Sequence, residues 1–224
     1  MCAEKKSTKL QHYEKFVKTQ SWVNLHRYEL NMLEPVFEHF CPFRCLYLGP
    51  ALSSNTLKKN DVVFGAHVLF DHCPVDVLID YTCLPFADRT FDLIICPHIH
   101  ELSDDNKSLF RELSRVLVPE GLCVVLGLNP SGMLQAGNYG GLGSDFSWVH
   151  NAYSPQVVKE MLAPYQFEFV YQQYGIYRLW LDSNLSLQTV SKWLPSTGGV
   201  YKLVFRLREL QPVYVGNTMA QAAT

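Results

Sequence analysis

Residues 78–98 of this chain read "LIDYTCLPFADRTFDLIICPH". The stretch completes one apolar run (75–80), passes through a turn that contains a proline, and continues into a second, almost uninterrupted apolar run over 91–98. Such a run is typical of a parallel strand that is covered by helices on both faces. Residues 91–98 are therefore predicted to form an inner strand of a parallel sheet.

Helical and strand patterns alternate on both sides of this stretch. Helices are predicted over 21–39, 51–59, 104–118 and 154–163, and further strands over 44–48, 61–71, 75–80, 122–129, 166–180 and 200–210. Asp104 or Asp105 is expected to cap the third helix, and Pro119 with Gly121 is expected to end it. The alternation predicts an α/β fold: a Rossmann-like, doubly wound, mostly parallel sheet of seven strands with a C-terminal antiparallel hairpin.

The composition of the chain limits the kinds of partner that it could bind. The chain has 224 residues, a net charge of −2 and a pI of about 6.4, which argues against a broad nucleic-acid or anionic-membrane surface. Arg111 and Arg115, four residues apart on a predicted helix, are expected to lie on a solvated face. The seven scattered cysteines fit reduced, buried thiols in the cytoplasm, and no apolar stretch reaches 18 residues, so no membrane span is predicted.

Four segments occur in a fixed order: "CLYLG" (45–49), "LIDYTCLPFADRTFDLII" (78–95), "CPHIHEL" (96–102) and "FRELSRVLVPEGLCVVLGLNP" (110–130). Together they resemble the class I S-adenosylmethionine-dependent methyltransferase family, in particular a branch of small-molecule enzymes with an LPF-x-D-x-x-FD segment. In "RVLVPEG", Glu120 stands where the family has its first glycine. The resemblance implies S-adenosyl-L-methionine as cofactor and a small molecule as methyl acceptor.

The first segment ends in Gly49, which lets a cofactor approach the backbone closely or simply makes a turn. The family's later glycines are missing after it, and Pro50 removes a backbone N–H that could face the ligand. Gly49 and Pro50 are nevertheless predicted to lie against the cofactor. The resemblance further implies that Asp71, after the second strand, binds the ribose hydroxyls; a solvated loop aspartate is the alternative.

The resemblance assigns four further residues to the cofactor. Asp80 matches the family's aspartate that accepts the adenine amino group, and the amide of Tyr81 then reaches the ring. Cys96 and Pro97 end the strand over 91–98, at an edge where the family places residues that face the cofactor. Ligands of open α/β sheets do lie at the carboxyl ends of the strands, which supports this placement.

His98 and His100 follow the same strand and are the predicted catalytic residues. An imidazole titrates near neutrality and could remove a proton from the acceptor. A capped or exposed loop residue is the alternative for each. With Glu101 the two histidines form too sparse a set to predict a metal site.

The chain is expected to consist of an N-terminal helical extension (1–40), a methyltransferase-like domain (41–210) and a flexible tail (211–224). The predicted function is methyl transfer from S-adenosyl-L-methionine to a small molecule. The alternative is a catalytically degenerate protein that serves as a binding or regulatory partner, so a protein partner stays open.

Overall fold

The structure is a computed structural model that describes residues 13, 15–49, 64–67, 77–132, 152–175 and 199–209. Several predictions lie outside these residues: the helix over 51–59, the cofactor roles of Pro50 and Asp71, and the tail over 211–224. The proposed boundaries of the extension and the domain stay predictions.

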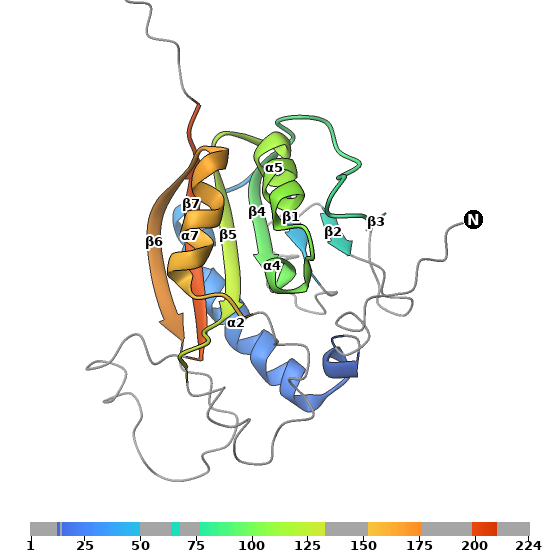
Figure 1. Ribbon diagram of the computed structural model, residues 1–224, viewed down its shortest axis with the longest axis vertical. Coiled ribbons are helices and arrows are strands. Elements are labelled where there is room, and N and C mark those ends of the chain that lie inside the picture. Colours follow the sequence, from blue (N-terminus) through green and yellow to red (C-terminus); the bar gives the residue numbers. More distant parts are fainter. Residues whose placement is uncertain are drawn as a thin grey trace, which may run out of the picture.

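Strands β1 (Cys45–Leu48), β2 (Phe64–His67), β3 (Val77–Leu78), β4 (Phe91–Pro97), β5 (Leu117–Leu128), β6 (Phe167–Gly175) and β7 (Val200–Leu207) form one sheet (Figure 1). Their order is β3-β2-β1-β4-β5-β7-β6. The first five strands run parallel, and β7 is antiparallel to β5 and β6. This confirms the predicted doubly wound α/β class with its C-terminal hairpin.

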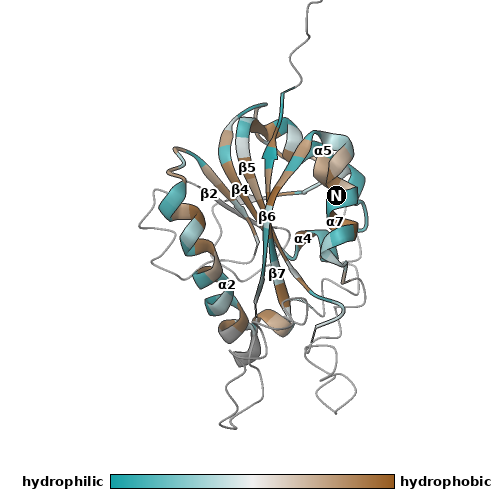
Figure 2. Cartoon of the chain, turned by 90° about the vertical axis from the view of Figure 1, so that its left-hand side faces the viewer, coloured by the Kyte–Doolittle hydropathy of each residue, from teal (hydrophilic) through white to brown (hydrophobic). Residues whose placement is uncertain are grey.

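Helix α2 (Gln20–His39) covers one face of the sheet (Figure 2). It begins where the Thr19 hydroxyl accepts a hydrogen bond from the amide of Trp22. Its buried apolar residues recur at helical spacing and pack on strands β1, β4 and β5. The contacts include Leu33 on the helix, Tyr47 on β1 and Ile95 on β4.

Helices α5 (Asn106–Val116) and α7 (Pro155–Leu162) cover the opposite face. Asp105 caps α5, one of the two expected residues, and Ser154 caps α7. A single turn, α4 (Ile99–Leu102), which the sequence patterns did not predict, follows β4 directly. Within the described residues, no helix combines the length and apolar character that a membrane span needs.

The start of β5 differs from the prediction. The strand begins at Leu117, directly after α5, so the helix does not continue to Pro119. Its register against β4 shifts between the pairs Phe91↔Leu117 and Leu93↔Leu122, which makes a bulge. Inside the bulge Glu120 has a φ of 63°, a conformation that favours glycine, and its exposed carboxylate pairs with Arg208.

Candidate functional site

The site lies where β1 and β4 end side by side. After β1 the chain continues to β2 on one side of β1, whereas β4 lies on the other side. Strand order therefore reverses between β1 and β4, and ligands of open α/β sheets bind at such a point. Gly49 ends β1 against Pro97 of β4: a Cβ on Gly49 would lie 2.5 Å from Pro97 Cγ and 2.9 Å from Tyr47 Cε1. Close packing between the strand ends therefore requires glycine here, whether or not a cofactor also approaches it.

His98 follows β4 in the left-handed conformation, with a φ of 60°, and its amide donates to the Leu126 carbonyl at 2.9 Å. This turn directs the ring into the protein, where its exposed fraction is 0%. Nδ1 lies 2.8 Å from Oε2 of Glu101, and Nε2 lies 2.8 Å from Oε1 of Glu29 on α2. The ring thus joins α4 to a helix that lies 69 positions earlier in the chain.

The two carboxylates determine the charge of His98. Burial by itself would lower the pKa of the imidazole, but Glu29 and Glu101 outweigh it and raise this pKa to about 10. At neutral pH both ring nitrogens of His98 therefore carry protons and donate to carboxylates. In this arrangement the ring cannot accept a proton from an acceptor.

Glu29 and Glu101 have different surroundings. The second oxygen of Glu101 accepts the amide of Leu128 at 2.7 Å, so this carboxylate is fully engaged. The second oxygen of Glu29 is buried and has no hydrogen-bond partner among the described residues. Two carboxylates against one imidazolium leave a net charge of −1 inside the protein.

His26, one turn before Glu29 on α2, lies at the same cluster. Its ring stacks on Trp22 with centroids 5.0 Å apart, and neither ring nitrogen has a partner among the described residues. Burial lowers the pKa of His26, although the charge of Glu29 opposes this. The ring is therefore neutral at neutral pH.

His100 lies on α4 and is as deeply buried as His98. Its Nε2 lies 2.9 Å from the Tyr201 hydroxyl on β7, and its Nδ1 has no partner among the described residues. Burial lowers the pKa of His100 to about 4, so this imidazole is neutral. Gly127 on β5 leaves room for the pair, because a Cβ there would overlap the Tyr201 hydroxyl.

Asp80 and Tyr81 form the turn after β3. The Asp80 carboxylate accepts hydrogen bonds from the amide and hydroxyl of Thr82, at 2.8 and 2.6 Å, and is exposed. Burial raises the pKa of Tyr81, and the neighbouring side chain of Ser103, at the end of α4, opposes this rise. The turn therefore lies beside the segment that carries His98 and His100.

Helix α5 holds the next part of this turn. Glu112 accepts the Leu84 amide at 2.9 Å, and Arg115 donates to the carbonyls of Leu84 and Phe86 at 3.0 and 2.8 Å. Arg115 also pairs with Asp88 at 2.7 Å. The expectation that Arg115 lies on a solvated face is therefore wrong, whereas Arg111 is exposed as expected.

Cys96 lies apart from this edge of the sheet. Its side chain is buried among the residues that pack on α5 and α7, next to Cys123 on β5. Burial raises the pKa of the Cys96 thiol well above its usual range. The predicted contact of Cys96 with a cofactor stays a prediction.

Residues 50–125 match the family model of a methyltransferase domain. Solved structures share the fold over most of the chain. One is an S-adenosylmethionine-dependent protein from Thermotoga maritima described as a possible histamine N-methyltransferase, with a TM-score of 0.62, 16% identity, and coverage of 89% of this chain and 100% of that one. These likenesses show that the chain shares the fold of S-adenosylmethionine-dependent methyltransferases.

Two more comparisons show what the chain is similar to. The N-methyltransferase NodS from Bradyrhizobium japonicum, solved with S-adenosyl-L-homocysteine, gives a TM-score of 0.58 at 13% identity, over 91% of this chain and 100% of that one. The uncharacterized protein YafS of Escherichia coli is 32% identical over 110 residues, 49% of this chain. The match spans about half of that relative, 46% of its length.

The structure brings Gly49, Pro97, His98 and His100 to one edge of the sheet, with the turn at Asp80 beside them. Reasoning from the sequence missed Glu29 and His26, because the helical pattern of α2 explained both as ordinary helix positions. A signal existed at Glu29: it stands at a position of the apolar stripe, where a carboxylate needs a buried partner.

Proposed function

We propose that this protein transfers a methyl group from S-adenosyl-L-methionine to a small-molecule acceptor at the shared edge of β1 and β4. One observation carries the proposal: the exposed Asp80 carboxylate follows β3 at the carboxyl edge of the parallel strands, the edge at which β1 and β4 end and strand order reverses (Figure 1). The methyltransferase domain and the shared fold support it.

The residues at this edge fit the cofactor chemically. One oxygen of the exposed Asp80 carboxylate, Oδ1, is engaged by Thr82, and the other can accept the amino group of an adenine. The sulfonium of the cofactor is a cation, and the cluster of Glu29, His98 and Glu101 carries a surplus negative charge. The Glu29 oxygen that has no partner in the described part of the chain supports a site that attracts a cation.

When bound, the cofactor would supply an electrophilic methyl carbon attached to a positively charged sulfur. The protein's part is to hold the two reactants in line, which accounts for much of the rate in such displacements. We assign His98 to positioning: as an imidazolium between two carboxylates it holds α2 and α4 at the edge. Of the two histidines, neutral His100 is the one able to accept a proton.

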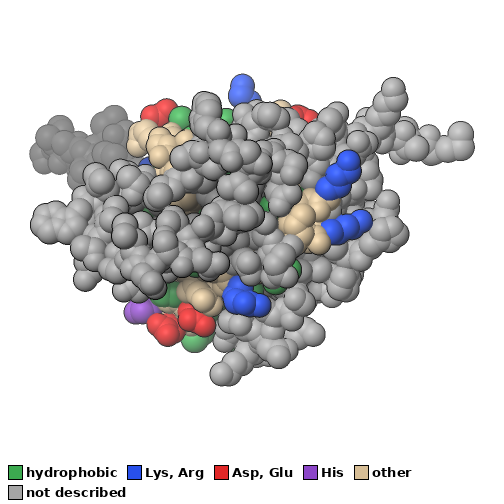
Figure 3. Space-filling model, turned by 90° about the horizontal axis from the view of Figure 1, so that it is seen from below, with side chains coloured by type: hydrophobic (Ala, Val, Ile, Leu, Met, Phe, Trp, Pro, Cys, Tyr) green, Lys and Arg blue, Asp and Glu red, His purple; other side chains and the backbone are tan. Residues whose placement is uncertain are grey.

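The acceptor we propose is small and uncharged or cationic. Seen from below, at the edge where the parallel strands end, the described lysine and arginine side chains are scattered and form no continuous patch (Figure 3). A nucleic-acid acceptor would need such a patch. Amines are the first class to screen, since the relatives from Thermotoga maritima and Bradyrhizobium japonicum are described as N-methyltransferases.

Calorimetry with S-adenosyl-L-homocysteine tests the proposal. The native chain is expected to bind in the micromolar range, and Asp80→Asn, which keeps an oxygen for the amide of Thr82, to bind about 10- to 100-fold more weakly. Glu38→Gln, an exposed change near the far end of α2, should bind like the native chain. No binding by the native chain at millimolar ligand would refute methyl transfer and support the degenerate, partner-binding alternative.

A further inference from the structure

Lys202 on β7 is a buried ammonium group that has no carboxylate partner among the described residues. Its exposed fraction is 0%, and its Nζ donates to the backbone carbonyl of Met32 on α2. The ring of Tyr171 on β6 lies 5.2 Å from the same nitrogen. No carboxylate among the described residues pairs with it, so two of its three N–H donors have no acceptor there.

Such a group is costly for the folded protein. A buried charge is normally paired, and an unpaired one is destabilised by the loss of water. Burial accordingly lowers the pKa of Lys202 to about 8. The hydrogen bond from Lys202 to the Met32 carbonyl also fastens α2 to the sheet.

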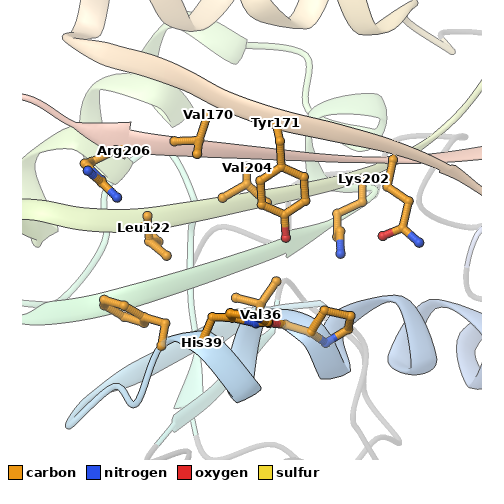
Figure 4. A pocket seen from close by; sticks show the side chains of 11 residues that line it. Val36, His39, Leu122, Val170, Tyr171, Lys202, Val204 and Arg206 are labelled. Carbon is orange, nitrogen blue, oxygen red and sulfur yellow. The ribbon is translucent and has the colours of Figure 1, made fainter.

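Lys202 lines one end of a pocket of about 410 Å³ between α2 and the hairpin of β6 and β7 (Figure 4). The pocket lies beside the far half of α2 and shares no residue with the cluster around His98. In Figure 4 the Lys202 amine and the Tyr171 hydroxyl both point from the sheet toward α2. Val36, Leu122 and Val204 form apolar walls.

The charges around this pocket have one sign. None of its lining residues is acidic, while Lys202 and Arg206 are cationic. The two lie four positions apart on the same face of β7, about 13 Å along the strand. In the part of the chain that the structure describes, the only carboxylate that pairs with Arg206 is that of Glu120, at 3.9 Å.

From this geometry we propose that the pocket binds a small amphipathic carboxylate, whose apolar body lies on Val36 and Val204 and whose carboxylate pairs with Lys202. The volume falls in the usual range for small-molecule sites, and an anion supplies the missing counter-charge. Tyr171, with an exposed fraction of 38%, lies on the outermost strand and gives access to the amine when it turns aside. This site is separate from the proposed methyl-transfer edge.

Decanoate and 1-decanol are suitable probes, because they share an alkyl chain and differ in charge. In calorimetry at pH 7, the native chain is expected to bind decanoate at least tenfold more tightly than decanol. Lys202→Met should remove this preference, with a 10- to 100-fold loss for decanoate. Lys202→Arg should retain most of it.

Lys159→Met is the matched control. Lys159 also lies over an aromatic ring, with Nζ 3.6 Å from the centroid of Phe169, but it bonds Gln172 and does not line the pocket. Its replacement should leave decanoate binding unchanged. Equal affinities of the native chain for decanoate and decanol would overturn the proposal without any variant.

A second result would overturn it as well: normal decanoate binding by a folded Lys202→Met protein, which would leave Lys202 only as the fastening between α2 and the sheet. The outcome does not depend on methyl transfer. Failure to bind S-adenosyl-L-homocysteine refutes the proposed function, whereas failure to discriminate decanoate refutes this pocket.

Discussion

Replacing Glu29 by glutamine removes one of the two carboxylates that hold the His98 imidazolium, with little change of shape. The pKa of His98 is about 10 against an ordinary 6.5, a difference of about 3.5 pH units. Each unit corresponds to about 1.4 kcal/mol, so the raised pKa represents on the order of 5 kcal/mol of stability. With two carboxylates sharing the ring, Glu29→Gln is expected to lower the free energy of unfolding by about 2–3 kcal/mol at pH 7.

The pH dependence of this loss has a definite sign. A group whose pKa is raised by folding contributes fully below its unfolded pKa, here about 6.5, and the contribution disappears as the pH rises through about 10. The gap between the native protein and Glu29→Gln should therefore be widest at pH 6–7 and fall below about 1 kcal/mol near pH 10.

Urea unfolding, followed by circular dichroism under reducing conditions at pH 6, 7, 8, 9 and 10, measures the gap. Glu34→Gln is the control, since Glu34 is exposed on the same helix and its replacement should change stability by less than about 0.5 kcal/mol. Equal stabilities of native protein and Glu29→Gln at pH 7, or a gap that stays constant up to pH 10, would show that His98 is not an imidazolium between two carboxylates.

Two further substitutions test contacts that hold the elements around the site together. Gly49→Ala places a Cβ 2.5 Å from Pro97 Cγ. It should therefore lower the free energy of unfolding, measured by urea titration, by about 1–3 kcal/mol. An unchanged free energy would contradict the tight contact between β1 and β4. Arg115→Met removes the hydrogen bonds to the carbonyls of Leu84 and Phe86 and should cost about 2 kcal/mol and speed amide hydrogen exchange over 82–86, while exposed Arg111→Met should do neither. Similar exchange in both arginine variants would mean that the turn does not depend on Arg115.

Local patterns were sufficient for most of the described elements. The apolar run of β4, the helical spacing of α2 and the capping side chains of Asp105 and Ser154 act over a few residues, and the structure contains each of these features. The start of β5 was predicted wrongly, because "VPEG" looks like the end of a helix. Pairing with β4 draws these residues into the sheet as a bulge instead.

The candidate site was only partly predictable. His98 and His100 were identified because they directly follow a buried strand, but their chemical states were not. The charge of His98 depends on Glu29, 69 positions away, and the neutrality of His100 depends on burial beside Tyr201, 101 positions away.

By itself, the sequence determined the α/β class and the two histidines that directly follow β4, because hydrophobic periodicity and caps are short-range properties of the chain. Only the tertiary structure decided which ionisable side chains meet. It brought together Glu29, His98 and Glu101, placed Arg115 against the carbonyls of the turn, and buried the ammonium group of Lys202. Charge and pKa depend on neighbours in space and on exclusion from water, and both are created when distant segments pack together.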